Sequence, residues 1–470
     1  MQNESAEAPP AGGGTAEPRL SARRRVFTLA WPVIGESFLE TLLMVVDTWM
    51  VAQLSTAAVA GVGTSVQVMF FVIAALGSLS VGSSVLVAQA FGAGKLADAS
   101  RLSRQSIVWS LLLAIPLAVL GSVFAAPIMG LFGAEDDVTR IGVEYLQVSM
   151  ATVVVLIVLL IGGGALRGLG DSQTPMRVTA VANVVNVFLN YGLIFGMAGL
   201  PALGAVGSAW GTFYSRLLAA ALLLYVMWRG RQGVSIAGRK GWRPDIKVAS
   251  SVLRVGVPAA LEQLLIATGF TLMTIIVASL GTASLAAHRI TFNALSLSFL
   301  PGFGFGIAAT ALVGQSFGAQ EPEQGAEVAD IATRWAILWM AAMAVVSFFL
   351  AEPIVRLYSK DPEVVRTGAA AIRVVALAQP FWATLFVQSG ALRGLGNTVF
   401  PLRSNSASIW STMAIAWVIV TFFDGGLAHV WGVFLITSPV NAVFLWRRFR
   451  RSVREWSQAL EKRAVQSAQA

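Results

Sequence analysis

The sequence contains no cysteine and only two histidines, His288 and His429. Without thiols, a disulfide framework and thiolate chemistry are both excluded. A zinc or di-iron site would have to be built almost without its usual ligands, so we expect no metal centre of this kind. The candidate chemistry of the chain therefore depends on carboxylates, amides and arginines.

Charged residues are also scarce. Asp, Glu, Lys and Arg make up 12% of the 470 residues, whereas hydrophobic residues make up 56%. Soluble domains usually carry about 25% charged residues. A water-soluble chain of this length could not bury so much apolar surface, and the composition therefore predicts a polytopic membrane protein.

Twelve apolar segments are long enough to cross about 30 Å of hydrocarbon as helices, and they form two groups of six. The segments are 27–52, 59–91, 102–125, 139–166, 174–198, 203–228, 248–280, 283–317, 328–350, 364–391, 399–423 and 428–446. They predict an all-α fold. The segment before them, 1–25, consists mainly of small and polar residues and is rich in Pro and Gly. We expect a disordered tail there.

The basic residues are concentrated between and beyond the spans. The net charge is +9, and Lys and Arg cluster in the linker 229–247 and the tail 447–470. Cytoplasmic loops of membrane proteins carry an excess of Lys and Arg, so the linker and both termini are predicted to be cytoplasmic. The positive charge then reflects membrane orientation and contact with anionic lipid, and we expect no nucleic-acid partner.

One six-residue motif, ALRGLG, occurs twice. Its copies are Ala165–Gly170 and Ala391–Gly396, which lie 226 residues apart. The same offset relates Glu36 to Glu262 and holds without a gap from about residue 32 to residue 175. Chance matches do not keep one register over such a length, so the chain is an internal duplication.

The duplication predicts the architecture. Each repeat contains six spans, an even number, so both begin on the same side of the membrane. We expect two parallel six-helix lobes, an N-lobe at 26–228 and a C-lobe at 248–446, around a central cavity. This arrangement permits alternating access by movement of one lobe against the other.

The ALRGLG copies fall at the ends of the fourth and tenth spans. Their glycines can end a helix in a left-handed turn. Arg167 and Arg393 then lie at helix C-termini, where the helix dipole favours a cation. Two interpretations stay open: a well-formed connector, and a gating role for the two arginines.

The first span carries three acids, Glu36, Glu40 and Asp47. Their spacings of four and eleven residues place them on one stripe of a helix with 3.6 residues per turn. A carboxylate in hydrocarbon is costly, so each must face a cavity, pair with a cation or be protonated. They are candidate sites for a proton that is taken up and released during transport.

Three amides recur on one face of the fifth span, at Asn183, Asn186 and Asn190. Amides can coordinate a cation or bond to a protonated carboxyl group. They can also hold neighbouring helices together. The residues alone leave both roles open.

The second repeat is less acidic than the first. Its single span acid is Glu262, whereas Met273 stands at the position that corresponds to Asp47. Arg216, midway along the sixth span, either neutralises a carboxylate of the N-lobe or extends toward the membrane surface. Gln67 falls opposite Asn293 in the repeat register, and we expect both in the polar lining of the cavity.

Taken together, several stretches resemble the multidrug and toxic compound extrusion (MATE) family. They are VVDTWMVAQLSTAAVAGVG, the two Q-x-F-G-A turns, the two ALRGLG turns, NVVNVFLNYGLIFG and AAHRITFNALSLSFLPGFGFGIAATALVGQSFGA. The resemblance covers nearly the whole chain after residue 25. It implies two six-helix lobes in a V shape and the export of lipophilic cations in exchange for protons or sodium.

The resemblance also assigns residues. Asp47 matches the acid of the N-lobe cation site, Asn186 and Asn190 match the polar pair beside it, and Glu262 matches the acid of the C-lobe. The tenth span has no acid and offers only Gln379, which we expect at the cavity, and Gln388. These features are closer to the DinF-like branch and favour a proton as the coupling ion, with sodium at Asp47, Asn186 and Asn190 as the alternative.

The resemblance further implies a monomeric, multi-pass protein of the bacterial inner membrane. Its partners would be amphipathic cationic compounds and membrane lipids, without a cofactor. One alternative is a flippase for lipid-linked precursors from the wider superfamily, although the cavity charges here are mainly acidic. A membrane enzyme would need a catalytic cluster near one surface, and the sequence contains none, so we expect no enzymatic activity.

Overall fold

The computed structural model describes residues 21–197 and 199–469, and over these residues the chain is almost entirely helical. The first half contains α1 (Ala22–Ala52), α2 (Thr56–Gly92), α3 (Leu96–Val123), α4 (Ala125–Gly130), α5 (Asp136–Ala151), α6 (Val153–Gly168), α7 (Gln173–Phe195) and α8 (Ala205–Arg229). The second half contains α9 (Ile246–Ala278), α10 (Thr282–Gly318), α11 (Pro322–Phe349), α12 (Ala351–Tyr358), α13 (Pro362–Ala376), α14 (Gln379–Gly394), α15 (Val399–Phe422), α16 (Leu427–Gly432) and α17 (Phe434–Gln469).

Ten described helices are long and apolar enough to cross a membrane, and two bent pairs bring the number of spans to twelve. This confirms the predicted twelve-span, all-α fold. The bent pairs are α5 with α6, at 48°, and α13 with α14, at 51°. Both had been expected as continuous spans.

The two bends have local causes. At the first, the hydroxyl of Thr152 donates to the carbonyl oxygen of Ser149 at 2.8 Å, a side-chain bond that bends helices. At the second, Pro380 lies in the first turn of α14, where it cannot continue the hydrogen bonds of a preceding helix.

The ends of the chain differ in detail from the expectation. Helix α1 begins at Ala22, so residues 22–25, expected in a disordered tail, form its first turn. Residues 1–20 of that tail lie outside the described part of the chain. At the other end, α17 continues as one helix through the basic segment up to Gln469.

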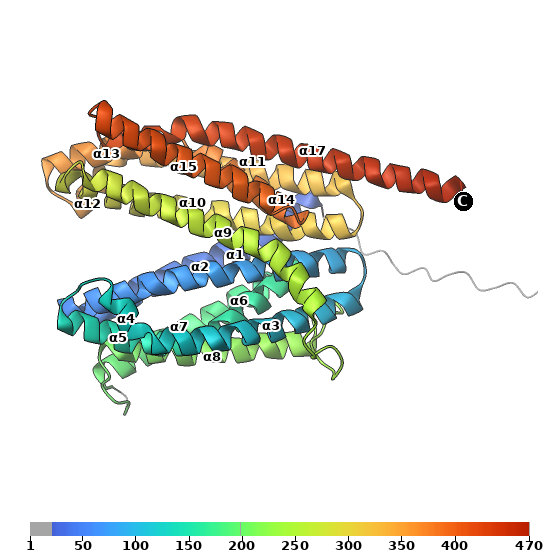
Figure 1. Ribbon diagram of the computed structural model, residues 1–470, viewed down its shortest axis with the longest axis horizontal. Coiled ribbons are helices and arrows are strands. Elements are labelled where there is room, and N and C mark those ends of the chain that lie inside the picture. Colours follow the sequence, from blue (N-terminus) through green and yellow to red (C-terminus); the bar gives the residue numbers. More distant parts are fainter. Residues whose placement is uncertain (1–20, 198, 470) are drawn as a thin grey trace, which may run out of the picture.

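The helices form two lobes (Figure 1). Helices α1–α8 make up most of the N-lobe and α9–α17 most of the C-lobe. The lobes come together at the end where α2 and α10 finish, and they diverge toward the opposite end. We call these the closed end and the open end. Because α1 runs away from the closed end, Asp47 lies in the half of α1 nearer the open end.

The first helix of each lobe reaches into the other lobe at the closed end. Val26, Leu29 and Ala30 of α1 are buried in the hydrophobic core of the C-lobe. Val252 of α9, the repeat mate of Val26, is buried in a core cluster of the N-lobe. Burial of a Val or Leu side chain that would otherwise face water stabilises such a contact by about 1.5–3 kcal/mol. Each lobe therefore packs around the first helix of the other lobe, and the closed end is symmetric.

The two ALRGLG turns have the predicted left-handed geometry. Gly170 has φ +91° and Gly396 has φ +81°. In the first turn Gly170 N–H donates to the carbonyl oxygen of Arg167, and Asp171 N–H donates to that of Leu166. The second turn repeats both bonds. This is a Schellman ending, in which two of the last helical carbonyls find partners within the turn.

The basic linker is docked on the N-lobe. Gln105 of α3 donates to the carbonyl oxygens of Gly241 and Arg243 and accepts from the backbone N–H of Asp245. Asp245 also pairs with Arg101 of α3. The start of α9 is therefore fixed to the N-lobe before the helix passes into the C-lobe.

Candidate functional site

The carboxylate of Asp47 is held by the amides of α7. Asn190 Nδ2 donates to Asp47 Oδ1 at 2.7 Å, and the same nitrogen lies 2.9 Å from Asn186 Oδ1. With the Asn186 amide turned over, its nitrogen lies 3.2 Å from Asp47 Oδ1. Both asparagines are fully buried, whereas Asp47 is half-buried. The three residues expected at the N-lobe site therefore lie together.

Helix α8 packs against the two asparagines of the site. The amide of Asn186 contacts the hydroxyl groups of Thr212 and Ser215, at 3.2 Å and 3.1 Å. A Cβ added at Gly211 would lie 1.9 Å from Asn190 Oδ1, so α8 needs glycine there to approach α7. The two amides are thus fixed before any ion or substrate arrives. Asn190 presents an N–H donor to the carboxylate, and Asn186 does so when its amide is turned over.

The third asparagine of α7 has a different contact. Asn183 Nδ2 donates to the backbone carbonyl oxygen of Leu39 at 2.8 Å. It ties α7 to α1 and does not reach Asp47. The asparagine stripe therefore divides into one helix-to-helix contact and a pair of amides at the carboxylate.

Glu36 is paired with an arginine of the first ALRGLG motif. Arg167 Nη1 lies 2.9 Å from Glu36 Oε2, and both side chains are about 15% exposed or less. Thr179 of α7 donates to the other carboxylate oxygen at 3.5 Å. Glu40, one turn further along α1, is exposed. The three acids of the predicted stripe therefore occupy three different environments.

The C-lobe repeats this ion pair. Arg393 Nη2 lies 2.8 Å from Glu262 Oε1, and the Glu262 side chain is only 1% exposed. Asn405, the repeat mate of Thr179, donates to the same oxygen at 2.6 Å. Arg393 thus neutralises Glu262 by direct contact. The equal spacing of 131 residues in both pairs was visible in the sequence, but it was not recognised as a contact.

Arg216 is the cation whose charge most influences the Asp47 site. It acts electrostatically on both Asp47 and Glu40. Within the described part of the chain it makes no ion pair shorter than 4 Å. Arg216 therefore offsets negative charge in the N-lobe without occupying the carboxylate.

The residues expected at the central cavity separate into two kinds. Gln67 of α2 and Asn293 of α10 both expose their side chains, on the two helices that face each other across the lobes. Gln379 is fully buried inside the C-lobe and accepts from Ser298 at 2.6 Å. It therefore does not face the space between the lobes in this conformation.

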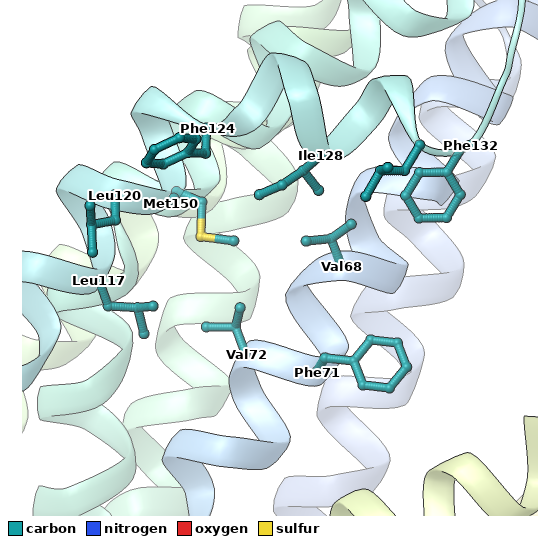
Figure 2. Close-up of a pocket in the computed structure, with 11 residues that line it drawn as sticks. Val68, Phe71, Val72, Leu117, Leu120, Phe124, Ile128, Phe132 and Met150 are labelled. Carbon is teal, nitrogen blue, oxygen red and sulfur yellow. The ribbon is translucent and has the colours of Figure 1, made fainter.

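A cavity of about 480 Å³ lies among helices of the N-lobe (Figure 2), and Asp47 is not part of its lining. Its lining is apolar and includes Phe71 and Val72 of α2, Leu117 of α3, Ile128 of α4 and Met150 of α5. No residue of this lining carries a charge or a polar side chain. The cavity therefore offers no side chain that could hold an ion.

One protein family model, MatE, matches the chain twice, at residues 32–192 and 258–418. The two matched segments begin and end 226 residues apart, which is the register of the internal repeat. The first segment contains the Glu36–Arg167 pair and the second the Glu262–Arg393 pair.

Curated relatives match along most of the chain. It is 33% identical over 411 residues to the "Probable multidrug resistance protein NorM" of Thermotoga maritima, covering 87% of this chain and 88% of that protein. It is 30% identical over 442 residues to the "Probable multidrug resistance protein NorM" of Burkholderia mallei, covering 90% and 92%.

Solved structures share the fold. The structure reported as "Outward-facing conformation of a multidrug resistance MATE family transporter of the MOP superfamily" superposes with a TM-score of 0.86 at 21% identity, covering 93% of this chain and 97% of that one. "Crystal structure of MATE in the straight conformation" gives a TM-score of 0.87. The family model and the full-length relatives together show that the chain belongs to the MatE family of membrane transporters.

Proposed function

We propose that the protein is a secondary active multidrug exporter that exchanges amphipathic cationic compounds for protons by alternating access. The observation that supports it most directly is the Asp47 site. Among the described residues, a carboxylate in the membrane-spanning part of the N-lobe accepts from the buried amide of Asn190, with the buried Asn186 beside it, and makes no ion pair with an arginine. It is free to bind a proton or to attract a cation.

Protons are favoured over sodium by the atoms that surround Asp47. Hard cations are held by several oxygen ligands at once. Asn190 instead turns its nitrogen toward the carboxylate, and Asn186 can do the same. In the C-lobe, Arg393 already neutralises Glu262. Each cycle would therefore exchange a proton at Asp47, with sodium at the same residues as the alternative.

The orientation follows from the charges. With both termini and the basic linker on the cytoplasmic side of a bacterial inner membrane, the open end faces outward. A cationic compound between the lobes would meet the negative charge of Asp47 and of the exposed Glu40. Protonation of Asp47 from outside would remove part of this attraction and release the compound.

Transport by purified protein in liposomes tests the proposal. A pH gradient without sodium should drive movement of a fluorescent lipophilic cation such as ethidium. Asn183→Ala, which alters a helix contact beside the site, is the matched control and should keep most of the transport. Transport that requires a sodium gradient would overturn the proton assignment, and no movement of any cationic compound under either gradient would overturn the exporter.

A further inference from the structure

At the closed end, α2 and α10 approach so closely that only glycine fits. A Cβ added at Gly92 would lie 1.9 Å from the backbone oxygen of Gln315, and one added at Gly318 would lie 1.9 Å from the backbone oxygen of Gln89. Gly92 and Gly318 are repeat mates, as are Gln89 and Gln315. The contact between the lobes is therefore made twice, by the same residues.

The side chains of these glutamines cross to the opposite lobe. Gln89 Nε2 donates to the carbonyl oxygen of Gly394 at 2.9 Å, and Gln315 Nε2 donates to that of Gly168, also at 2.9 Å. Both acceptors are the final helical residues of the ALRGLG motifs. The Schellman turns satisfy the two preceding carbonyls and leave these two without a partner in their own helix.

We propose that Gln89 and Gln315 are positioning residues that form a two-fold latch and hold the closed end shut. The proposal rests on the alternating access of the proposed function. When the lobes part at this end, both glutamines and both carbonyls are exposed to water, which replaces the two hydrogen bonds. The net stabilisation by each bond is small for this reason, so the latch can open and close within a transport cycle.

The same motif links the latch to the ion pairs. Arg167 holds Glu36 of its own lobe, and the adjacent Gly168 accepts from Gln315 of the other lobe. Arg393 and Gly394 repeat this arrangement with Glu262 and Gln89. Arg25 of α1 also donates to the side-chain oxygen of Gln315, at 3.3 Å, which fixes the direction of that amide. A movement of an ALRGLG motif within its own lobe would therefore alter its hydrogen bond to the glutamine of the other lobe.

Distance measurement between spin labels tests the latch directly. The chain has no native cysteine, so Ala97→Cys and Glu323→Cys can carry the labels. These positions are repeat mates, exposed, in the first turns of α3 and α11 at the closed end. The measurement uses purified full-length protein in lipid nanodiscs, without substrate and without a gradient, so its outcome does not depend on the coupling ion.

Gln89→Met and Gln315→Met keep the side-chain length and remove the N–H donor. We expect each to raise the ratio of the longer to the shorter distance by about fivefold, the effect of one ordinary hydrogen bond, and the double variant to raise it further. Gln147→Met, an exposed position on α5, should leave the ratio unchanged. A distance distribution that stays the same in both latch variants would overturn the proposal.

Glycine substitution gives a second test by the same distance measurement, and it does not depend on the glutamine side chains. Gly92→Ala should also shift the distribution to the longer distance, because the added methyl group blocks the approach of α10. Gly63→Ala in the same helix meets no atom within 4 Å and is the matched control. Equal distributions for the two alanine variants would contradict the latch, whereas transport that depends on sodium would contradict only the proposed coupling ion.

Discussion

Asp47 is the residue on which the proposed proton exchange depends. Asp47→Asn keeps the shape of the side chain but cannot bind or release a proton. We expect pH-driven transport to fall to the background rate. The fold should lose no more than about 1–2 kcal/mol, because the amide oxygen of the variant can still accept from Asn190.

Transport in liposomes and thermal unfolding in detergent check this pair of expectations. Asn183→Ala again serves as the control, since its contact is to the backbone of α1. Full transport by a well-folded Asp47→Asn variant would show that the proton is carried elsewhere, with Glu40 as the next carboxylate to examine.

At the residue scale, the Glu36–Arg167 and Glu262–Arg393 ion pairs differ in how deeply the glutamate is buried. Glu262 is 1% exposed and Glu36 is 15% exposed. Removing the partner of a buried charge costs about 3–5 kcal/mol. We therefore expect Arg393→Gln to lower the melting temperature clearly more than Arg167→Gln.

A second variant separates lost charge from lost packing. Glu262→Gln combined with Arg393→Gln removes both charges and should recover much of the stability that Arg393→Gln loses. If the double variant melts no higher than Arg393→Gln alone, the loss is due to packing. Differential scanning fluorimetry in one detergent is sufficient for the comparison.

At the scale of elements, the start of α9 depends on its cap. Asp245 accepts from the backbone N–H of Lys247 at 2.9 Å, and this bond, with Arg101 beside it, lowers the pKa of the Asp245 carboxyl below its ordinary value. A carboxylate with a lowered folded-state pKa stabilises the fold fully above its ordinary pKa of about 3.9, and that contribution is lost as the pH falls through the lowered value.

Hydrogen exchange along the first turns of α9 should report this cap. Asp245→Ala should speed exchange there at neutral pH, and the wild-type protein should approach the behaviour of the variant only when the solution becomes strongly acidic. Asp98→Ala, an exposed acid in the first turn of α3, is the control. Equal exchange of α9 in the two variants at neutral pH would show that Asp245 does not cap the helix.

At the scale of the whole molecule, the position of the open end can be measured. Gln67→Cys and Asn293→Cys should react with a membrane-impermeant maleimide from the outer side, because both side chains are exposed between lobes that diverge toward that end. Ala88→Cys, on α2 and buried against Gly314 of α10 near the closed end, should stay unlabelled in this conformation. Labelling of Ala88→Cys from the cytoplasmic side, with neither cavity position labelled from the outer side, would mean that the protein rests in the opposite state.

The sequence by itself determined the membrane class, the number of spans, the duplication and the turns that end the ALRGLG helices. These features depend on the length of apolar segments and on the local freedom of glycine, which are properties of neighbouring residues. The resemblance to the MATE family also brought Asp47 together with Asn186 and Asn190, whereas the residues alone left the role of the amides open.

Only the tertiary structure decided which partner each polar group has. Asn183 bonds to the backbone of α1, Gln379 is buried, and Arg167 neutralises Glu36. Each of these choices depends on how far apart two packed helices lie and which faces they turn to each other. The closed end depends most on this packing of helices. Gln89 and Gly394 are 305 residues apart, and they meet only because glycines let α2 and α10 touch.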